Sequence, residues 1–216
     1  MRGRARLSRP SDDTGSMNLI DRISAQFEDN MRTTLEALEL LAAPIAGAVE
    51  LITASLLDNG KVLVCGGSGC AGDARRFAAQ LVNGFELERP SLAALALSAD
   101  TSTLAPLTGE PDAASMFARQ IHAFGHPGDI LITLSTGADS ARIEQAIHAA
   151  HERDMTVVIL SGRTGGKLAA LVRETDVLIS VPHDRAARVR EVHALVLHCL
   201  CDGVDAQLLG EQEIPQ

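Results

Sequence analysis

Aromatic residues are scarce in this chain. It has no tryptophan or tyrosine, and phenylalanine occurs five times in 216 residues. Proteins that hold single-stranded nucleic acid commonly stack the bases on aromatic side chains, so we expect no such platform. Basic residues are also outnumbered, with 19 Lys and Arg against 28 Asp and Glu and a net charge of -9. A negative net charge disfavours electrostatic binding to the phosphate backbone, so we expect no direct binding of nucleic acid.

Long apolar runs and paired cysteine motifs are missing too. No stretch approaches the roughly 20 uninterrupted apolar residues of a membrane span, and no apolar segment follows the arginine-rich start to make a signal peptide. We therefore expect no membrane segment and a cytoplasmic location. The cysteines, Cys65, Cys70, Cys199 and Cys201, match neither a zinc ribbon nor a disulfide framework. We expect reduced thiols packed as small hydrophobic groups.

The hydrophobic content of 46% in 216 residues is enough for one substantial core and too little for two linked domains. Residues 1–16 are polar, contain four arginines and lack periodicity, so we expect a disordered leader. Either Met1 or Met17 can be the natural start. Residues 17–212 are then expected to form a single domain.

A helical pattern occupies the first part of this domain. Apolar residues recur at helical spacing at Leu19, Ile23, Phe27, Met31, Leu35, Leu38 and Leu41. We expect this helix to break at Pro44 and a second helix to follow through Ile45 and Leu51. The apolar stripe of the first helix needs a partner, so we expect it to pack against another subunit.

Five short apolar runs alternate with amphipathic stretches in the rest of the chain. The predicted strands are 61–65, 92–97, 130–134, 156–160 and 177–181. The runs are rich in Val, Ile, Leu and Ala, as strands buried on both faces are. The sequence therefore predicts an α/β fold, a three-layer doubly wound five-stranded parallel sheet with long N-terminal helices. Ligands of such sheets bind at the carboxyl ends of the strands.

Two loops that follow these strands are candidates for holding a phosphate. The first, CGGSGC from Cys65, has glycines that let backbone N–H groups approach an anion, although a tight turn also favours glycine. The second, STGADS from Ser135, brings three hydroxyls to a helix N-terminus, where the helix dipole favours an anion. Capping of that helix by Asp139 or Ser140 is the alternative interpretation.

A third loop, SGRTGGK from Ser161, contains glycines and cations. Gly and Lys are common at exposed turns, and for this loop we favour the exposed turn over a phosphate site.

Taken together, these segments resemble the sugar isomerase (SIS) domain family, in the branch that contains phosphoheptose isomerase and the DnaA initiator-associating protein DiaA. The likeness is carried by CGGSGCAGDARRFAAQL from Cys65, ERPSLAALAL from Glu88, GHPGDILITLSTGADS from Gly125, RDMTVVILSGRTGGKLAAL from Arg153 and RVREVHALVLHCLCDGVD from Arg188. It extends from about Met17 to the last helix. The resemblance implies a flavodoxin-like SIS fold and a homotetramer built on long helices.

The resemblance also implies where isomerase chemistry would reside. Such a reaction needs a general base, a general acid and often a metal. The isomerase has a His and, four residues on, a Glu on the helix after the first loop, and a Gln and, eight residues on, a His on the last helix. The matching residues here are Arg76, Gln80, Arg190 and His198. Only His198 is retained, as a candidate acid.

The substitutions change what these positions can do. A guanidinium has no lone pair for a metal, and an amide is too weak a base to take a proton from carbon. Arg76 and Arg190 would repel a divalent cation and suit a phosphate or carboxylate, so the site is expected to hold an anion. We expect no cofactor, and zinc only if the protein is an isomerase after all.

The loops also depart from the family pattern. The family has Asn-Gly-Gly-Ser where this chain has Gly67 to Cys70, Asn-Asp at Gly109-Glu110, and a serine at Gly137. The candidate ligand-binding residues that follow from both lines of reasoning are Gly67, Ser68, Gly69, Ser135, Thr136, Ser140, Arg76, Gln80 and Arg190.

The histidines divide into two groups. His198 occupies the matching acid position, while His193 on the same helix is expected to be a packed residue. The other five, His122, His126, His148, His151 and His183, are expected at the surface or in turns.

Two functions from different classes remain open. The first is a DiaA-like SIS protein without isomerase activity that binds a phosphorylated sugar or similar small anion and regulates a partner such as the replication initiator. The alternative is a phosphoheptose isomerase that converts sedoheptulose 7-phosphate to D-glycero-D-manno-heptose 7-phosphate. A structural partner of an active paralogue is a third possibility.

Overall fold

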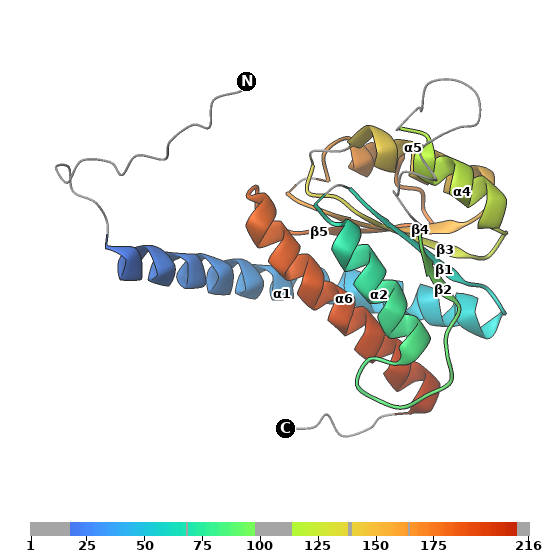
Figure 1. Cartoon of the computed structure of the whole chain (residues 1–216), viewed down its shortest axis with the longest axis horizontal. Helices are drawn as coiled ribbons and strands as arrows, with labels where there is room; N and C mark the ends of the chain where they lie inside the picture. Colours follow the sequence, from blue (N-terminus) through green and yellow to red (C-terminus); the bar gives the residue numbers. More distant parts are fainter. Residues whose placement is uncertain (1–17, 68, 98–113, 138–139, 164, 211–216) are drawn as a thin grey trace, which may run out of the picture.

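The structure is a computed structural model that describes residues 18–67, 69–97, 114–137, 140–163 and 165–210. The expected leader, Met17, Ser68, Gly109-Glu110, Asp139 and residues 211–212 lie outside the described residues, as does the side chain of Ser140. Figure 1 shows a sheet sandwiched between helices, with one long helix extending away from it.

Five parallel strands form one sheet in the order β2-β1-β3-β4-β5. The strands are β1 (Val62–Gly66), β2 (Ala94–Ala96), β3 (Ile130–Leu134), β4 (Thr156–Ser161) and β5 (Val177–Ser180). Each of the five predicted strands is present within one or two residues of its expected bounds. The central strands β1 and β3 are buried along their whole length, which explains why their sequences are continuously apolar.

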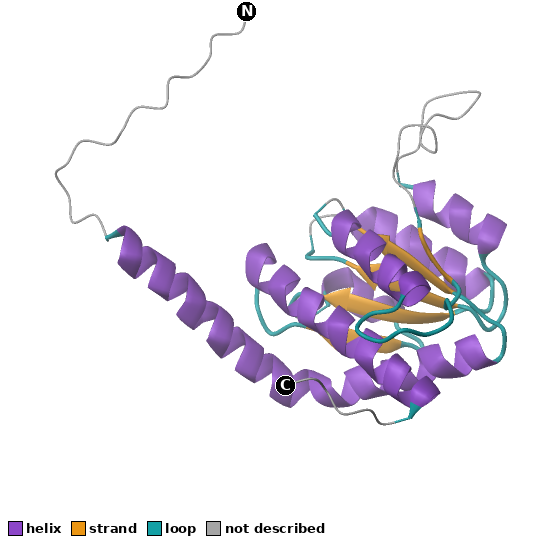
Figure 2. Cartoon of the chain, turned by 60° about the horizontal axis from the view of Figure 1, so that its bottom comes forward, coloured by secondary structure: helices purple, strands orange, loops and turns teal. Residues whose placement is uncertain are grey.

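Helices cover both faces of the sheet (Figure 2). They are α1 (Leu19–Leu57), α2 (Ala71–Asn83), α4 (Met116–Phe124), α5 (Ser140–Glu152), the short 3-10 helix η1 (Gly166–Leu171) and α6 (Ala186–Leu209). One core cluster joins α1, α2 and α6 to one face, and the other joins α4, α5 and η1 to the opposite face. Alternate residues of β1 divide between them, with Val62 and Val64 in the first and Leu63 and Cys65 in the second. The three-layer α/β fold is confirmed.

The expected break at Pro44 is wrong. A single helix runs from Leu19 to Leu57 with Pro44 inside it. Proline removes one backbone hydrogen bond and disfavours the helix interior. Buried residues on both sides of the proline, including Leu41 and Ile52, belong to the same core cluster, so tertiary packing holds the helix together across it.

The N-terminal half of α1 keeps its apolar stripe exposed. Leu19, Ile23, Phe27, Met31, Leu35 and Leu38 are all more than half exposed. By length and composition alone, α1 and α6 are apolar enough to cross a membrane. This is weak evidence, because α6 is a core helix and core helices pass the same test. The expected lack of a membrane segment stays a prediction.

Cysteine packing matches the expectation at three positions. Cys65, Cys70 and Cys201 are buried in the two core clusters. Cys199 is exposed, since it lies on the side of α6 that faces away from the sheet core. Burial raises the pKa of Cys65 and, to about 12, that of Cys201, so neither thiol is a nucleophile near neutral pH.

Candidate functional site

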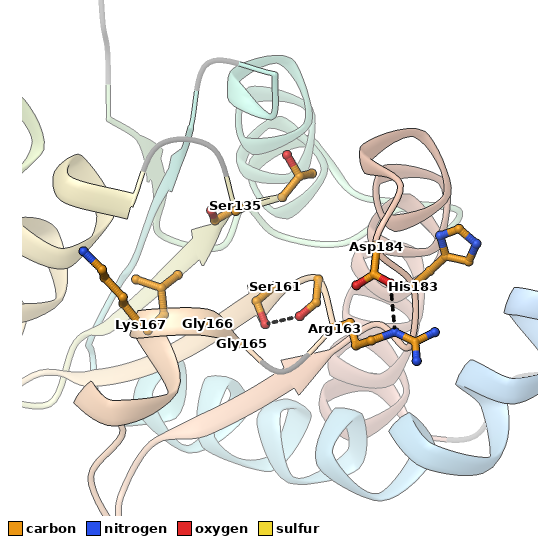
Figure 3. A pocket seen from close by; sticks show the side chains of 12 residues that line it. Ser135, Ser161, Arg163, Gly165, Gly166, Lys167, His183 and Asp184 are labelled. Atoms are coloured by element: carbon orange, nitrogen blue, oxygen red, sulfur yellow. Dashed lines mark hydrogen bonds and ion pairs between the residues drawn. The ribbon is translucent and has the colours of Figure 1, made fainter.

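A cavity of about 320 Å³ opens at the carboxyl ends of β3 and β4. Its lining comes from the loop after β3, the loop after β4 with the start of η1, and the turn before α6: Ser135, Thr136, Gly137, Ser161, Gly162, Arg163, Gly165, Gly166, Lys167, Leu168, His183 and Asp184. Figure 3 shows Lys167 on one side, Arg163, His183 and Asp184 on the other, and Ser135 and Ser161 between them. The cavity lies where ligands of doubly wound sheets bind.

The loop after β3 presents hydroxyls at the start of α5. Ser135 is buried, its N–H donates to Leu160 O at 2.9 Å, and its Oγ accepts from Gly137 N–H at 3.1 Å. Gly137 has φ of 102°, a conformation that favours glycine and in which a serine would be strained. Thr136 is half-buried and lines the cavity. The loop therefore places polar groups beside the positive end of a helix dipole.

The loop after β4 forms the opposite wall. Ser161 is buried and its Oγ lies 2.8 Å from Ser180 Oγ, which fixes the start of the loop. The Arg163 guanidinium donates from Nη2 to Pro182 O at 2.9 Å, and its Nε lies 3.4 Å from Asp184 Oδ2. Lys167 is exposed and makes no ion pair with another described residue. Sequence reasoning favoured an exposed turn here, whereas the structure places the loop in the cavity wall.

His183 is a cavity residue that the sequence did not single out. Its Nδ1 accepts the Arg185 N–H at 3.0 Å, and its Nε2 lies 3.6 Å from Asp29 Oδ1 on α1. A hydrogen bond from Arg32 lowers the pKa of Asp29, and the charge of Arg185 lowers it further. Asp29 thus ties α1 to the turn beside the cavity. Only a fold prediction could have revealed this contact, since 154 positions separate the two residues.

The prediction of a surface or turn position is wrong for one of the five histidines. His151 is 7% exposed, and its Nε2 lies 2.8 Å from Asp176 Oδ2. Asp176 also accepts the Val157 N–H at 2.9 Å, so the pair anchors the end of α5 against the start of β4. A helical periodicity cannot distinguish such a paired, buried histidine from an exposed one.

The first loop lies next to this site but does not line the described cavity. A Cβ atom at Gly66 would lie 2.6 Å from Cys70 O, so the turn requires glycine there. Gly67 N–H donates to Leu134 O at 2.9 Å and is therefore engaged within the protein. Gly69 is exposed and lies near Arg190, since a Cβ there would be 3.9 Å from its Cδ and Nη1.

The four positions that match the isomerase residues lie on α2 and α6. The Arg76 guanidinium hydrogen-bonds to Asp73, and Arg190 Nε lies 3.9 Å from the other oxygen of the same carboxylate. Gln80 Oε1 lies 3.9 Å from Cys201 Sγ. The ring of His198 stacks on Phe85 with centroids 5.2 Å apart. None of the four lines the described cavity, and the two arginines are the pair that the structure brings together.

This donor set does not fit a metal ion. Arg76 and Arg190 have no lone pair to give, and Asp73 is already engaged by both guanidinium groups. Within the described ranges, no group of three His, Cys, Asp or Glu side chains is arranged to hold a metal. A zinc ion at these four positions would meet two positive charges, one neutral amide and one imidazole, that of His198, whereas zinc sites use three or four His, Cys, Asp or Glu ligands.

Comparison with known proteins finds relatives of the chain in one domain family. The sequence profile of the SIS domain matches residues 26–162. The chain is 55% identical over 197 residues to phosphoheptose isomerase of Azoarcus sp. (strain BH72), which covers 91% of this chain and all of that protein. A relative named phosphoheptose isomerase from Methylibium petroleiphilum (strain ATCC BAA-1232 / LMG 22953 / PM1) is 50% identical over 196 residues, covering 91% and 98%.

Two solved structures give the same result. Phosphoheptose isomerase GmhA from Neisseria gonorrhoeae superposes with a TM-score of 0.81 at 42% identity, covering 88% of this chain and all of that one. A phosphoheptose isomerase from Francisella tularensis gives 0.82 at 36% identity, covering 88% and 99%. The resemblance expected from the sequence is confirmed, and this chain belongs to the SIS domain family, in its phosphoheptose isomerase branch.

Proposed function

We propose that this protein binds a phosphorylated sugar in the cavity at the carboxyl ends of β3 and β4. The observation that carries the proposal is the composition of the cavity wall, where Thr136 and Lys167 face a space beside the N-terminus of α5. A phosphate prefers this combination of a hydroxyl, an ammonium and a helix dipole. A volume of about 320 Å³ suits a ligand of this size.

A phosphoheptose is the first ligand to test. The relatives that are 55% and 50% identical are named phosphoheptose isomerase, and they match nearly the whole chain. Sedoheptulose 7-phosphate is therefore the probe of choice, with sedoheptulose and inorganic phosphate as partial ligands. A binding site that recognises both parts of the molecule holds the whole tighter than either part.

Calorimetric titration with sedoheptulose 7-phosphate tests this proposal. Lys167→Ala removes a charge-assisted contact and should weaken binding about tenfold or more, while Thr136→Val removes one neutral hydroxyl and should weaken it less. Arg75→Ala, an exposed change on α2 outside the cavity, is the control and should bind like the unmodified protein. Equal affinity in all three variants would place the ligand elsewhere, and no binding at millimolar concentration would reject the proposal.

Isomerase activity is the second candidate function, and the names of the relatives favour it. The residues at the matching positions oppose it, because Arg76 and Gln80 supply neither a metal ligand of the usual kind nor a base for a carbon acid. We expect that the protein, with zinc added, does not interconvert sedoheptulose 7-phosphate and D-glycero-D-manno-heptose 7-phosphate above the uncatalysed rate.

An NMR assay of the sugar phosphates decides between the two. The variant Arg76→His/Gln80→Glu/Arg190→Gln restores the residues of the isomerase pattern and is the positive comparison. Turnover by the unmodified protein that disappears in Lys167→Ala would establish the isomerase. Turnover only in the restored variant would support binding without catalysis.

We also propose that the exposed face of α1 packs against a second copy of the chain. Its apolar side chains are what support this assembly. A homotetramer and contact with a replication initiator, both expected from the resemblance, stay predictions, and the comparisons reported above lend the initiator no support.

A further inference from the structure

Arg76 and Arg190 come from different helices and meet at one carboxylate. Arg76 on α2 hydrogen-bonds to one oxygen of Asp73, and Arg190 on α6 approaches the other with its Nε at 3.9 Å. The Asp73 side chain is 11% exposed, whereas those of Arg76 and Arg190 are 55% and 50% exposed. The carboxylate is therefore held inside while both guanidinium groups reach solvent.

The charges of this cluster do not cancel. Asp73 supplies one negative charge against the two positive charges of the guanidinium groups. Glu191, next to Arg190 in the chain, accepts hydrogen bonds from Arg188 and Asn30 and does not pair with the cluster. The shared carboxylate orients both guanidinium groups, and most of their N–H donors remain available. An oriented pair of guanidinium groups with excess positive charge is a binding site for a phosphate or carboxylate.

The first loop lies between this cluster and the cavity. The side chain of Arg190 lies beside Gly69 of the first loop. In the same loop, Gly67 N–H donates to Leu134 O at 2.9 Å, and Ser135 in the cavity wall directly follows Leu134, the last residue of β3. Asp73 itself lies in the first turn of α2, which begins at the end of this loop. The cluster and the cavity thus share the carboxyl edge of the sheet.

We propose that Arg76 and Arg190 bind a second anionic group of the ligand, so that the protein prefers sugars with two negatively charged groups over sugar monophosphates. The inference rests on the proposed function, because the first phosphate occupies the cavity. It names the ligand class: a sugar bisphosphate or a phosphorylated sugar acid. The two positions that hold a His and a Gln in the isomerase pattern hold the second anion here.

Paired titrations test this preference. Sedoheptulose 1,7-bisphosphate is compared with sedoheptulose 7-phosphate, and 6-phosphogluconate with glucose 6-phosphate. One added charge-assisted contact predicts about tenfold tighter binding of the doubly anionic member of at least one pair. The two pairs also separate a second phosphate from a carboxylate as the preferred group. The preference should shrink as salt rises, since the contacts are partly exposed.

Three variants test whether the preference for doubly anionic sugars arises from Arg76 and Arg190. Arg76→Gln and Arg190→Gln should each remove most of the difference in affinity between the two members of a pair. Arg75→Gln removes an exposed charge from the neighbouring position of α2 and should keep the preference. Thermal unfolding of each variant identifies any that has lost its fold.

The outcomes also separate this inference from the proposed function. Monophosphates that bind as tightly as their doubly anionic partners would overturn the inference and leave the proposed function standing. A preference that persists in both arginine variants would overturn it too. If neither member of either pair binds at millimolar concentration, the proposed function and the inference both fail.

Discussion

His193 is fully buried, which is unusual for a histidine side chain. It belongs to α6, and its Nε2 lies 3.2 Å from Ser161 O in the wall of the cavity. Burial lowers its pKa to about 4, which the hydrogen bond to Ser161 and the charge of Asp73 only partly offset. His193 therefore stays neutral at physiological pH, with the proton on Nε2, and supports the loop that carries Lys167.

Stability should depend on pH through this histidine. In the unfolded chain the pKa of His193 returns to about 6.5. Between pH 6.5 and pH 4 the histidine is therefore protonated in the unfolded state and neutral in the native state. Its contribution is complete above pH 6.5 and is lost as pH falls to 4, by up to about 3 kcal/mol.

Chemical denaturation across this pH range checks the effect. His193→Asn can still donate to Ser161 O but does not titrate, so the unmodified protein should lose more stability than the variant between pH 6.5 and 4. Parallel losses in the two proteins would show that His193 is not the responsible group.

At the scale of single residues, the sequence indicated some of the residues that line the cavity and missed others. Ser135 and Thr136 were predictable because they follow a buried strand and precede a helix. The sequence could not predict that Lys167, Arg163 and His183 line the cavity. Glycines and cations form the same local pattern in an exposed turn as in a loop that lines a cavity. The positions of these three residues depend on which strands are neighbours in the sheet.

The two longest helices pack closely at a single glycine. Gly203 on α6 lies against Val49 on α1, and a Cβ atom there would be 2.7 Å from Val49 Cγ2 and 3.0 Å from Cγ1. Overpacking of this kind typically destabilises by about 1–3 kcal/mol. The contact of α6 with α1 therefore depends on the absence of a side chain at this position.

Gly203→Ala should lower the free energy of unfolding, despite the better helix propensity of alanine. Gly47→Ala is the matched control, because Gly47 lies in α1 and a Cβ atom there would meet no described atom within 4 Å beyond its own helix backbone. The control should stabilise by up to about 1 kcal/mol. Equilibrium denaturation of both variants compares them, and a stabilised Gly203→Ala would refute the close packing.

Secondary structure was more predictable than its continuity. The strands followed from buried apolar runs whose pattern is local, and all five are present. Pro44 was expected to end a helix because its local preference is strong. Packing of both halves of α1 into one core outweighs that preference, and no window of sequence around Pro44 contains the information.

The whole molecule leaves an apolar groove between α1 and α6. It has a volume of about 280 Å³ and is lined by Thr34, Leu35, Ala37, Leu38, Leu41, Ala42, Ile45, Val192, Leu195, Val196 and Cys199. Leu35 and Leu38 are each 65% exposed. Apolar surface of this extent favours burial against another protein surface, which supports the proposed contact between copies.

Leu35→Glu/Leu38→Glu should lower the mass of the assembly, because two carboxylates cannot be buried in an apolar interface without a large free-energy loss. Analytical ultracentrifugation measures the mass directly. Leu57→Glu, which changes an exposed leucine at the far end of α1, should leave the assembly intact. At a protein concentration of tens of micromolar, even a dimer with a micromolar dissociation constant is mostly associated. If the unmodified protein sediments as a monomer at that concentration, the proposed contact between copies is wrong.

A crystal structure of the protein grown with sedoheptulose 7-phosphate and zinc tests the central claim most directly. The account predicts phosphate density in the cavity between Thr136 and Lys167, with Arg76 and Arg190 free of metal. A zinc ion coordinated beside Arg76, Gln80 and His198, or a phosphate bound away from the cavity, would contradict it.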